Sequence, residues 1–335
     1  MNGTGKRRDR RRVIILGKII VGFLLIALGF FLGRYGVEKR ALLNTKKIEK
    51  REIGYKYISP LLECESYNSS LDYNFPEIQK KTKKIIDSHI AKKDVDLVSL
   101  YLRDLNNGPW MAINGENKFS PASLLKVPLM MAYFKLAEED ETLLNKKLVV
   151  QNYQEEISPN ILPQKTVQAG EEYNVEELIS YMIKYSDNVA ANTLLTNIST
   201  RDIENIYNDF GLKVPGSGET ENFMTVMEYS SFFRTLYNAS YLNRKMSEKA
   251  LKLLTSPTFT QGIVAGLPRE TLVAHKFGER VFENKKQLHD CGIIYSNKGN
   301  YLLCIMTKGD DFKKMEEAIA NISKNVFHNL NSFTN

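Results

Sequence analysis

The amino-acid sequence predicts an α+β fold, in which helices flank one antiparallel sheet and an all-helical lobe is inserted between its strands. Three observations support this prediction. Strand patterns occur near both ends of the predicted domain, consecutive helical patterns fill its middle, and a strand hairpin followed by a helix closes it. One transmembrane helix is expected to precede this domain. The chain therefore divides into a basic tail over 1–12, a membrane anchor over 13–33, a stalk over 34–74 and the domain over 75–335.

The composition excludes a largely disordered chain. Of the 335 residues, 43% are hydrophobic and 25% are charged, which suits a globular core. The net charge is +7, and much of the excess is concentrated in the tail over 1–12. A basic tail can bind nucleic acid, but this one directly precedes an apolar run, so we interpret it as a membrane-topology signal.

The apolar run extends from Val13 to Leu32 and contains a single charged residue, Lys18. A helix of this length can cross the hydrocarbon core of a bilayer, and Lys18 is close enough to the basic end for its side chain to reach the headgroups. A cleaved signal peptide is the alternative, but residues 33–36 offer no good small-residue cleavage site. We expect a single-pass anchor in the cell membrane with a cytoplasmic N-terminus, joined by a charged, weakly periodic stalk to an extracytoplasmic domain.

The domain is predicted to begin with a helix and two strands. Apolar residues recur at helical spacing from about Glu77 to Ile90. The Val- and Leu-rich run Val95–Leu102 indicates a strand, because it ends in a turn of Asn, Gly and Pro. Trp110–Ile113 is expected to pair back against it as a second strand.

The middle of the domain is predicted to be helical. Asn174 followed by Glu177 predicts a capping box at the start of one helix. A glycine at position 211 is expected to end another. The helices that follow the capping box are expected over Val189–Asn197, Thr200–Phe210, Met224–Tyr237 and Ser247–Leu254.

Strands return near the C-terminus, and a helix over Phe312–Leu330 closes the domain. These strands are expected over Leu272–Phe277, Leu288–Tyr295 and Tyr301–Thr307, and the last two form a hairpin. Cys291 and Cys304 flank the hairpin turn, where a disulfide and a pair of small buried thiols both remain open. With Cys64 they make up the three cysteines of the chain and show no metal-ligand spacing, so no cofactor is expected.

Ser123 and Lys126 form a Ser-x-x-Lys pattern just after Pro121 and Ala122, where a helix is expected to begin. Residues three positions apart share a helix face, so the Lys126 amine can reach the Ser123 hydroxyl and activate it as a nucleophile. Backbone N–H groups at the helix N-terminus can hold a developing oxyanion. Taken alone, the pattern also fits an ordinary surface pair.

Two further motifs follow. Ser-Asp-Asn at 186–188 falls between two predicted helices, where these residue types also serve as simple helix caps. Lys-Phe-Gly at 276–278 falls on a predicted strand. Each motif is weak evidence alone. In this order, and at a helix start, an inter-helix turn and a sheet edge, the three together favour an acyl-transfer site.

With these motifs, the chain from about residue 75 to its C-terminus resembles the class A β-lactamase-like and penicillin-binding serine hydrolases. The Phe-Ser-Pro-Ala sequence at 119–122 and the Asn-Val-Ala-Ala-Asn run at 188–192 add to the resemblance. The resemblance implies an acyl-enzyme, with a β-lactam or a D-Ala-D-Ala-type stem peptide of the cell wall as substrate. A non-catalytic surface binding module on the same fold is the alternative.

The resemblance also implies roles for individual residues. Ser123 would attack the substrate carbonyl, Lys126 would accept its proton, and Ser186 would pass a proton to the leaving nitrogen. Lys276 would supply positive potential beside Ser186. The substrate-binding residues would be Asn188, Phe277, Gly278 and Glu279, and the backbone N–H groups of Ser123 and Glu279 would form the oxyanion hole.

The Lys-Phe-Gly motif departs from the Lys-Thr-Gly of the family. Phe277 replaces the threonine hydroxyl and Glu279 adds a negative charge, which should weaken the binding of anionic β-lactams unless Arg280 points inward. His275 precedes Lys276 but is expected to point away from the site, because successive strand residues face opposite ways.

The connection over 211–224 is the second departure. It is short and lacks the Glu-x-x-Leu-Asn motif whose glutamate activates the deacylating water in class A β-lactamases. Glu219 and Glu221 are the local alternatives, and both also fit simple solvated loop charges. Slow deacylation is therefore expected.

Overall fold

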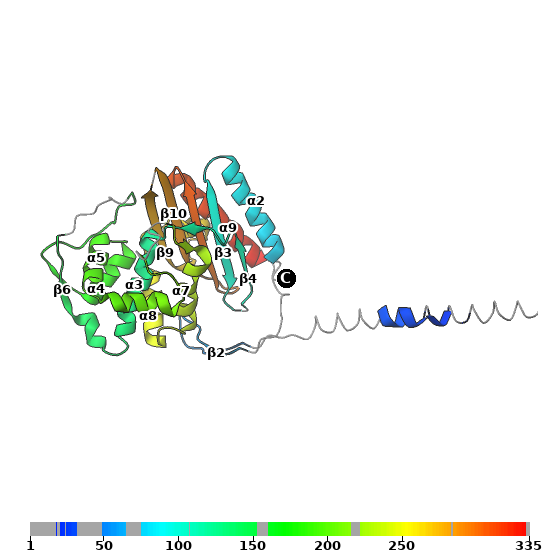
Figure 1. Cartoon of the computed structure of the whole chain (residues 1–335), viewed down its shortest axis with the longest axis horizontal. Helices are drawn as coiled ribbons and strands as arrows, with labels where there is room; N and C mark the ends of the chain where they lie inside the picture. The colour runs from blue at the N-terminus through cyan, green and yellow to red at the C-terminus, as the bar shows by residue number, and fades with distance from the viewer. Residues whose placement is uncertain are drawn as a thin grey trace, which may run out of the picture. The chain divides into compact units, whose positions relative to one another are not determined.

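The computed structural model of the chain describes residues 18, 21–23, 25–31, 49–64, 75–106, 108–152, 160–215, 222–282 and 284–332. The chain falls into two units, Met1–Ile48 with Glu65–Ser69, and Glu49–Cys64 with Ser70–Asn335. The second unit holds the predicted domain, whose helices and strands are labelled in Figure 1.

The first unit contains part of the predicted membrane anchor. Residues 21–23 and 25–31 are helical, and their large apolar side chains are exposed. Among the residues that the structure describes, no helix is both long and apolar enough to span a bilayer. The transmembrane helix predicted over 13–33 is thus not found, and the remainder of that span lies outside the described residues, as does the tail over 1–12.

The domain is built on a five-stranded antiparallel sheet in the order β4-β3-β11-β10-β9. Its strands are β3 (Leu97–Asp104), β4 (Trp110–Ile113), β9 (Leu272–Phe282), β10 (Lys285–Tyr295) and β11 (Tyr301–Gly309). Because β3 pairs with β11, strands from the two ends of the domain sequence lie side by side. Both faces are covered, which is why β10 and β11 carry long runs of buried residues.

One face of the sheet is covered by α2 (Phe75–Ala91), α9 (Phe312–Ser332) and the short turn η3 (Ile263–Gly266), as Figure 1 shows. Ile78 and Ile86 of α2 belong to the core on this face and recur at the helical spacing that the sequence predicted. The helix begins at Phe75, slightly before the predicted start.

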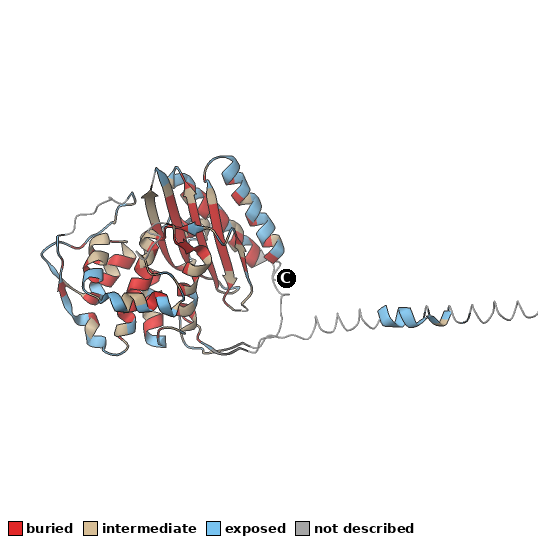
Figure 2. Ribbon diagram, viewed as in Figure 1, coloured by how far each residue is buried: buried red, intermediate tan, exposed pale blue. Residues whose placement is uncertain are grey.

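The opposite face carries the helical lobe, as Figure 1 also shows. Its helices are α3 (Lys126–Leu136), α4 (Val175–Lys184), α5 (Asn188–Thr196), α6 (Thr200–Asp209), α7 (Val226–Asn238) and α8 (Arg244–Leu254), with η1 (Ala122–Leu125) before α3 and η2 (Glu141–Asn145) after it. Helix α3 is buried along most of its length because nearly all of its residues are apolar. Buried residues concentrate in the sheet and in the inner helices (Figure 2). The predicted α+β architecture with an inserted helical lobe is confirmed.

Two-stranded sheets complete the described part of the domain. They pair β1 (Glu49–Arg51) with β2 (Leu61–Cys64), β5 (Lys118–Phe119) with β8 (Met224–Thr225), and β6 (Lys147–Val149) with β7 (Glu172–Asn174). The predicted capping box is confirmed, since the Asn174 side chain accepts the Glu177 N–H at the start of α4. Helix α7 begins later than predicted, at Val226, because the two preceding residues pair with β5.

The predicted stalk over 34–74 includes residues 49–64, which instead belong to the compact domain unit. Tyr57 and Ile58 are buried in the core, and the Ile58 N–H donates a hydrogen bond of 2.9 Å to Glu248 on α8. The few buried residues of this charged stretch make no repeating pattern, so the sequence could not indicate this docking. The other residues of the predicted stalk lie outside the described residues.

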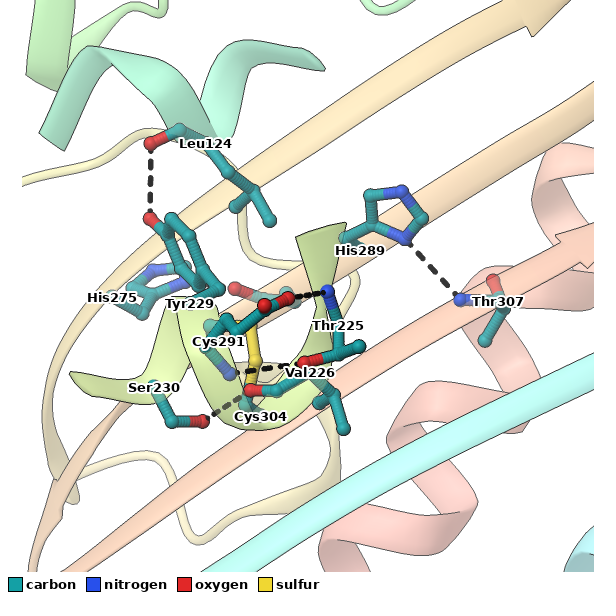
Figure 3. Close-up of a disulfide and its surroundings, with 12 residues drawn as sticks. Leu124, Thr225, Val226, Tyr229, Ser230, His275, His289, Cys291, Cys304 and Thr307 are labelled. Atoms are coloured by element: carbon teal, nitrogen blue, oxygen red, sulfur yellow. Dashed lines mark hydrogen bonds and ion pairs between the residues drawn. A yellow bond between two sulfur atoms is a disulfide. The ribbon is translucent and has the colours of Figure 1, made fainter. Parts of the chain in front are cut away.

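Cys291 and Cys304 are directly opposite on β10 and β11, with Cα atoms 3.9 Å apart, and form a disulfide. Figure 3 shows it beneath α7, close to Tyr229 and Ser230. On the other side of β10, Cys291 is the register partner of Lys276 on β9. Of the two possibilities that the sequence left open, the structure has the disulfide.

Candidate active site

A cavity of about 690 Å³ opens between the helical lobe and the edge strand β9. Six of the eight predicted site residues line it: Ser123, Lys126, Ser186, Asn188, Phe277 and Glu279. The remaining two, Lys276 and Gly278, are buried directly beside it on β9. Residues that are up to about 160 positions apart in the sequence are thus brought to one place by the fold.

Ser123 lies in the 3-10 turn η1, which leads straight into α3. Ala122 before it adopts a left-handed backbone with φ of 50°, a conformation that a non-glycine residue seldom adopts outside constrained sites. The turn is held from outside, because the Tyr229 hydroxyl donates to the Leu124 carbonyl at 3.1 Å. N–H groups at the start of a helix lack intrahelical acceptors, so this turn suits an oxyanion hole.

Ser120, two positions before the turn, is held by two side chains of β10. Its N–H donates to Gln287 Oε1 at 3.0 Å, and its carbonyl oxygen accepts from His289 Nε2 at 2.9 Å. His289 Nδ1 in turn accepts the Thr307 N–H at 3.3 Å, which defines the neutral tautomer with hydrogen on Nε2. Burial lowers the pKa of His289 to about 4, so its hydrogen bonds are those of a neutral imidazole.

Gly278 lies where β9 touches the nucleophile turn. A Cβ atom at this position would come within 2.7 Å of the Pro121 carbonyl oxygen and 3.0 Å of the Leu124 nitrogen. Both are backbone atoms, which cannot move aside as a flexible side chain can. Glycine is therefore required here to let β9 approach η1, and we assign Gly278 this packing role within the substrate site.

Lys126 begins α3 and is 6% exposed. Its amine donates to the Ser186 carbonyl at 2.5 Å, to Asn188 Oδ1 at 2.6 Å and to Ser186 Oγ at 3.3 Å. These bonds span from α3 to the turn before α5 and hold the first two motifs together. Because Lys126 and Ser123 line the same cavity within one helical turn, the amine is well placed to serve the hydroxyl.

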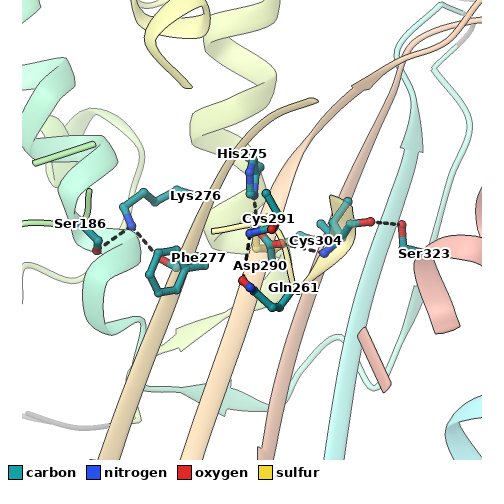
Figure 4. Close-up of polar contacts among 11 residues, drawn as sticks. Ser186, Gln261, His275, Lys276, Phe277, Asp290, Cys291, Cys304 and Ser323 are labelled. Carbon is teal, nitrogen blue, oxygen red and sulfur yellow. Dashed lines mark hydrogen bonds and ion pairs between the residues drawn. A yellow bond between two sulfur atoms is a disulfide. The ribbon is translucent and has the colours of Figure 1, made fainter. Parts of the chain in front are cut away.

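Lys276 is fully buried, and Figure 4 shows its amine between Ser186 and Phe277. It donates to Ser186 Oγ at 2.8 Å and to the Phe277 carbonyl at 2.8 Å. Burial and the nearby charge of Lys126 lower its pKa well below the usual value, and the charges of Asp290 and Glu279 only partly oppose this. The two amines and the Ser186 hydroxyl between them form one connected hydrogen-bonded group.

Ser186 itself has a left-handed backbone conformation, with φ of 56°. The following Asp187 is 1% exposed and is a structural residue. Its carboxylate accepts the Val189 N–H at 2.9 Å as the N-cap of α5, and the Thr166 hydroxyl and Val167 N–H at 3.0 and 2.9 Å. The Ser-Asp-Asn motif therefore serves both as a helix cap and as part of the cavity wall, because Asp187 caps α5 while its two neighbours line the cavity.

Phe277 does not point wholly into the cavity. Its ring stacks on Phe259, with centroids 4.2 Å apart, and the side chain is 5% exposed. The Lys276 amine lies 4.2 Å from the centroid of the Phe277 ring. The aromatic ring thus packs against the buried amine and presents no hydroxyl to a substrate.

His275 points away from the site, as predicted from strand alternation. Its Nδ1 donates to Asp290 Oδ1 at 2.8 Å on the face covered by η3, and both side chains are buried. Asp290 also accepts the Ile263 N–H at 2.8 Å. Figure 4 shows His275 turned toward Asp290 while Lys276 turns toward Ser186.

The proposed deacylation bases Glu219 and Glu221 lie outside the described residues. Among the described residues that line the cavity, the acidic ones are Glu204 and Glu279. Glu204 was not predicted, because it lies on α6 in no recognisable motif. The sequence also gave no signal for the apolar part of the cavity, which is lined by Leu129, Ala191, Leu195, Ile198, Ile203, Tyr207, Val214 and Pro215. Within the described part of the chain, no group of His, Cys, Asp or Glu is arranged to hold a metal ion.

The fold and this cavity define a serine hydrolase of the β-lactamase-like class. The model of the β-lactamase enzyme family matches residues 78–330, and the chain belongs to this family. The β-lactamase VEB-1 of Pseudomonas aeruginosa is 22% identical over 255 residues, which cover 69% of this chain and 82% of that protein.

Solved structures show the same fold. A β-lactamase from Sphaerobacter thermophilus superimposes with a TM-score of 0.66 at 19% identity, covering 75% of this chain and 97% of that one. A mutant of PBP-A, in an acyl-enzyme complex with penicillin G, superimposes with a TM-score of 0.62 at 20% identity, covering 75% and 96%. At these identities the likeness concerns the fold alone.

Proposed function

We propose that this chain is a membrane-anchored, extracytoplasmic serine hydrolase that forms an acyl-enzyme on Ser123 and hydrolyses it slowly. Its substrates are β-lactams or D-Ala-D-Ala-type stem peptides of the cell wall. One observation carries the proposal. Ser123, Lys126 and Ser186 line one cavity, and Lys276 donates to Ser186 Oγ at 2.8 Å beside it.

Acylation begins with Ser123. Its Oγ attacks the substrate carbonyl as its proton passes to the neutral amine of Lys126, and the C–O bond forms. An amine can accept a proton only when neutral, and two ammonium groups around one hydroxyl repel each other. Burial and, next, the charge of Lys126 lower the pKa of Lys276, so the two amines together favour a single positive charge and leave one amine neutral. The backbone N–H groups of Ser123 and Glu279 hold the oxyanion.

Ser186 protonates the leaving nitrogen. Its Oγ accepts hydrogen bonds from Lys276 and Lys126, so its own proton is free to move to the nitrogen as the C–N bond breaks. The hydroxyl recovers a proton from one of the two amines. Asn188, bonded to Lys126 at 2.6 Å, lies beside the cavity where a substrate amide would bind.

Deacylation requires a base that activates water near the Ser123 ester. The described cavity wall offers Glu204 and Glu279, and neither belongs to a Glu-x-x-Leu-Asn motif. Deacylation is therefore expected to be slow. The fold neighbour PBP-A, captured as a mutant acyl-enzyme with penicillin G, supports this proposal.

The anchor is proposed from the sequence. The run from Val13 to Leu32, the basic tail before it and the exposed apolar side chains over 25–31 support it. Full-length protein is expected in the membrane fraction after carbonate extraction, whereas a variant without residues 1–33 is expected in the supernatant. Recovery of both proteins in the supernatant would refute the anchor.

Intact-protein mass spectrometry tests the enzyme. The full-length chain in detergent is incubated with penicillin G beside Ser123→Ala, and the mass is followed over time. We expect a covalent adduct that persists for many minutes in the wild type and none in the variant. Rapid loss of the adduct with turnover would refute slow deacylation, and an adduct in Ser123→Ala would refute the role of Ser123.

A further inference from the structure

Glu279 places a carboxyl group at the wall of the active-site cavity, on the edge strand β9. One of its oxygens, Oε1, accepts the Ile161 N–H at 2.6 Å. The other, Oε2, is buried and has no hydrogen-bond partner among the described residues. A buried carboxylate oxygen without a donor is unfavourable, so this atom has an unused capacity to accept a hydrogen bond.

The cations nearest the reaction centre are already engaged with the protein. Lys276 donates to Ser186 Oγ and to the Phe277 carbonyl, and Lys126 donates to Ser186 and Asn188. Phe277 adds a ring that packs on Phe259 and carries no hydroxyl. Arg280 lines the same cavity. A substrate carboxylate beside Lys276 would meet the negative charge of Glu279.

Burial has a further consequence for Glu279. It raises the pKa of the carboxyl group, and hydrogen bonding from Ile161 and Asn160 and the charge of Lys126 only partly oppose this rise. The ionised form is thus poorly solvated where it stands. A substrate N–H group or cation beside the Glu279 carboxyl group would offset the cost of its burial, whereas an anion would add repulsion in a partly buried site.

We propose that Glu279 determines specificity by favouring substrates that present a hydrogen-bond donor or a cation beside Lys276 and by disfavouring those that present a carboxylate there. Among acyl donors for Ser123, the preferred ones are therefore those without a carboxylate at this position. The inference rests on the proposed acyl-enzyme function of Ser123 and names the substrate class of that same site. The apolar wall, with Leu129 and Ile203 among its residues, suits a hydrophobic group on the acyl part of such a substrate.

Two probes with the same acyl group isolate the effect of the substrate charge. Penicillin G carries a carboxylate, and penicillin G methyl ester carries none. The rate of acylation of the full-length chain in detergent is measured for each probe by intact-protein mass spectrometry. The ratio of the two rates is then compared between variants, so that the intrinsic reactivity of each probe cancels.

The informative variant is Glu279→Gln, which removes the charge and keeps an oxygen for the Ile161 N–H. We expect it to raise the ratio of the acylation rate with penicillin G to the rate with the methyl ester roughly tenfold. Glu270→Gln, the same change at an exposed position before β9, is the matched control and should leave the ratio unchanged.

The outcomes separate the inference from the proposed function. Adducts with both probes and an unchanged ratio in Glu279→Gln would overturn the inference alone. A change of the ratio in Glu270→Gln equal to that in Glu279→Gln would overturn it as well. If neither probe gave a Ser123-dependent adduct with any variant, both the proposed function and the inference would be refuted.

Discussion

The hydroxyl oxygen of Ser186 lies 2.8 Å from the amine nitrogen of Lys276, although 90 positions separate the two residues in the chain. The bond joins the turn before α5 to the edge strand β9. In the proposed mechanism, this bond leaves the Ser186 proton available for the leaving group and provides a donor to restore it. Substitutions at this contact and in the residues packed around it should have measurable effects.

Replacement of Lys276 should abolish most activity without weakening the fold. Lys276→Met keeps the volume of the buried side chain but removes the amine that serves Ser186, so acylation by any reactive probe should slow by roughly 100-fold or more. Because burial disfavours the charge of Lys276, the substitution should leave the melting temperature unchanged or higher. Lys285→Met, on the exposed start of β10, is the control and should acylate normally. Acylation of Lys276→Met within about fivefold of the wild type would contradict the assigned role.

Gly278→Ala should damage catalysis by displacing the nucleophile turn. The added methyl group would meet backbone atoms of Pro121 and Leu124, so η1 and β9 must separate, and displacement of a reacting group by about 1 Å can slow a reaction roughly 100-fold. Gly115→Ala meets side-chain atoms only, Met227 Sδ at 3.0 Å and Ala112 Cβ at 3.1 Å, and should retain acylation. Equal acylation rates in the two variants would show that the contact does not position Ser123.

His289 should make the fold sensitive to mild acid. Its pKa is lowered from 6.5 to about 4 by burial, so between these values only the unfolded chain binds the proton. The stability due to neutral His289 is present above pH 6.5 and is lost as the pH falls toward 4. Between pH 7 and 4.5 this lowers the free energy of unfolding by roughly 2 kcal/mol.

Denaturant titrations of the wild type and His289→Gln at both pH values isolate this effect, because the other titrating groups are common to both proteins. The wild type should lose about 2 kcal/mol more than the variant between pH 7 and 4.5. Parallel losses in the two proteins would show that His289 does not remain neutral in the folded state.

The disulfide should stabilise the hairpin that supports Lys276. The 13-residue separation of Cys291 and Cys304 closes a short loop, for which about 3 kcal/mol is typical. The double variant Cys291→Ala/Cys304→Ala should lose stability of this order, whereas Cys64→Ala should not. Thiol titration of the unfolded, unreduced wild type should find one free thiol per chain, and three free thiols would contradict the disulfide.

The sequence by itself determined the order of the elements and the identity of the reacting groups. Helical spacing of apolar residues located α2, the Asn174 and Glu177 pair located the start of α4, and strand alternation placed His275 and Lys276 on opposite faces. These features depend on neighbours within a few positions, so a local pattern records them. The motifs around Ser123, Ser186 and Lys276 are also local, and they indicated the class of reaction.

Only the tertiary structure decided how those groups meet. The packing of residues 49–64 on α8, the contact of Gly278 with Pro121, and the unpartnered oxygen of Glu279 depend on segments far apart in the chain. The pKa of Lys276 likewise depends on its burial and on Lys126, 150 positions earlier in the sequence. Such contacts leave no periodic trace in the sequence, because burial and electrostatic interaction depend on distance in space.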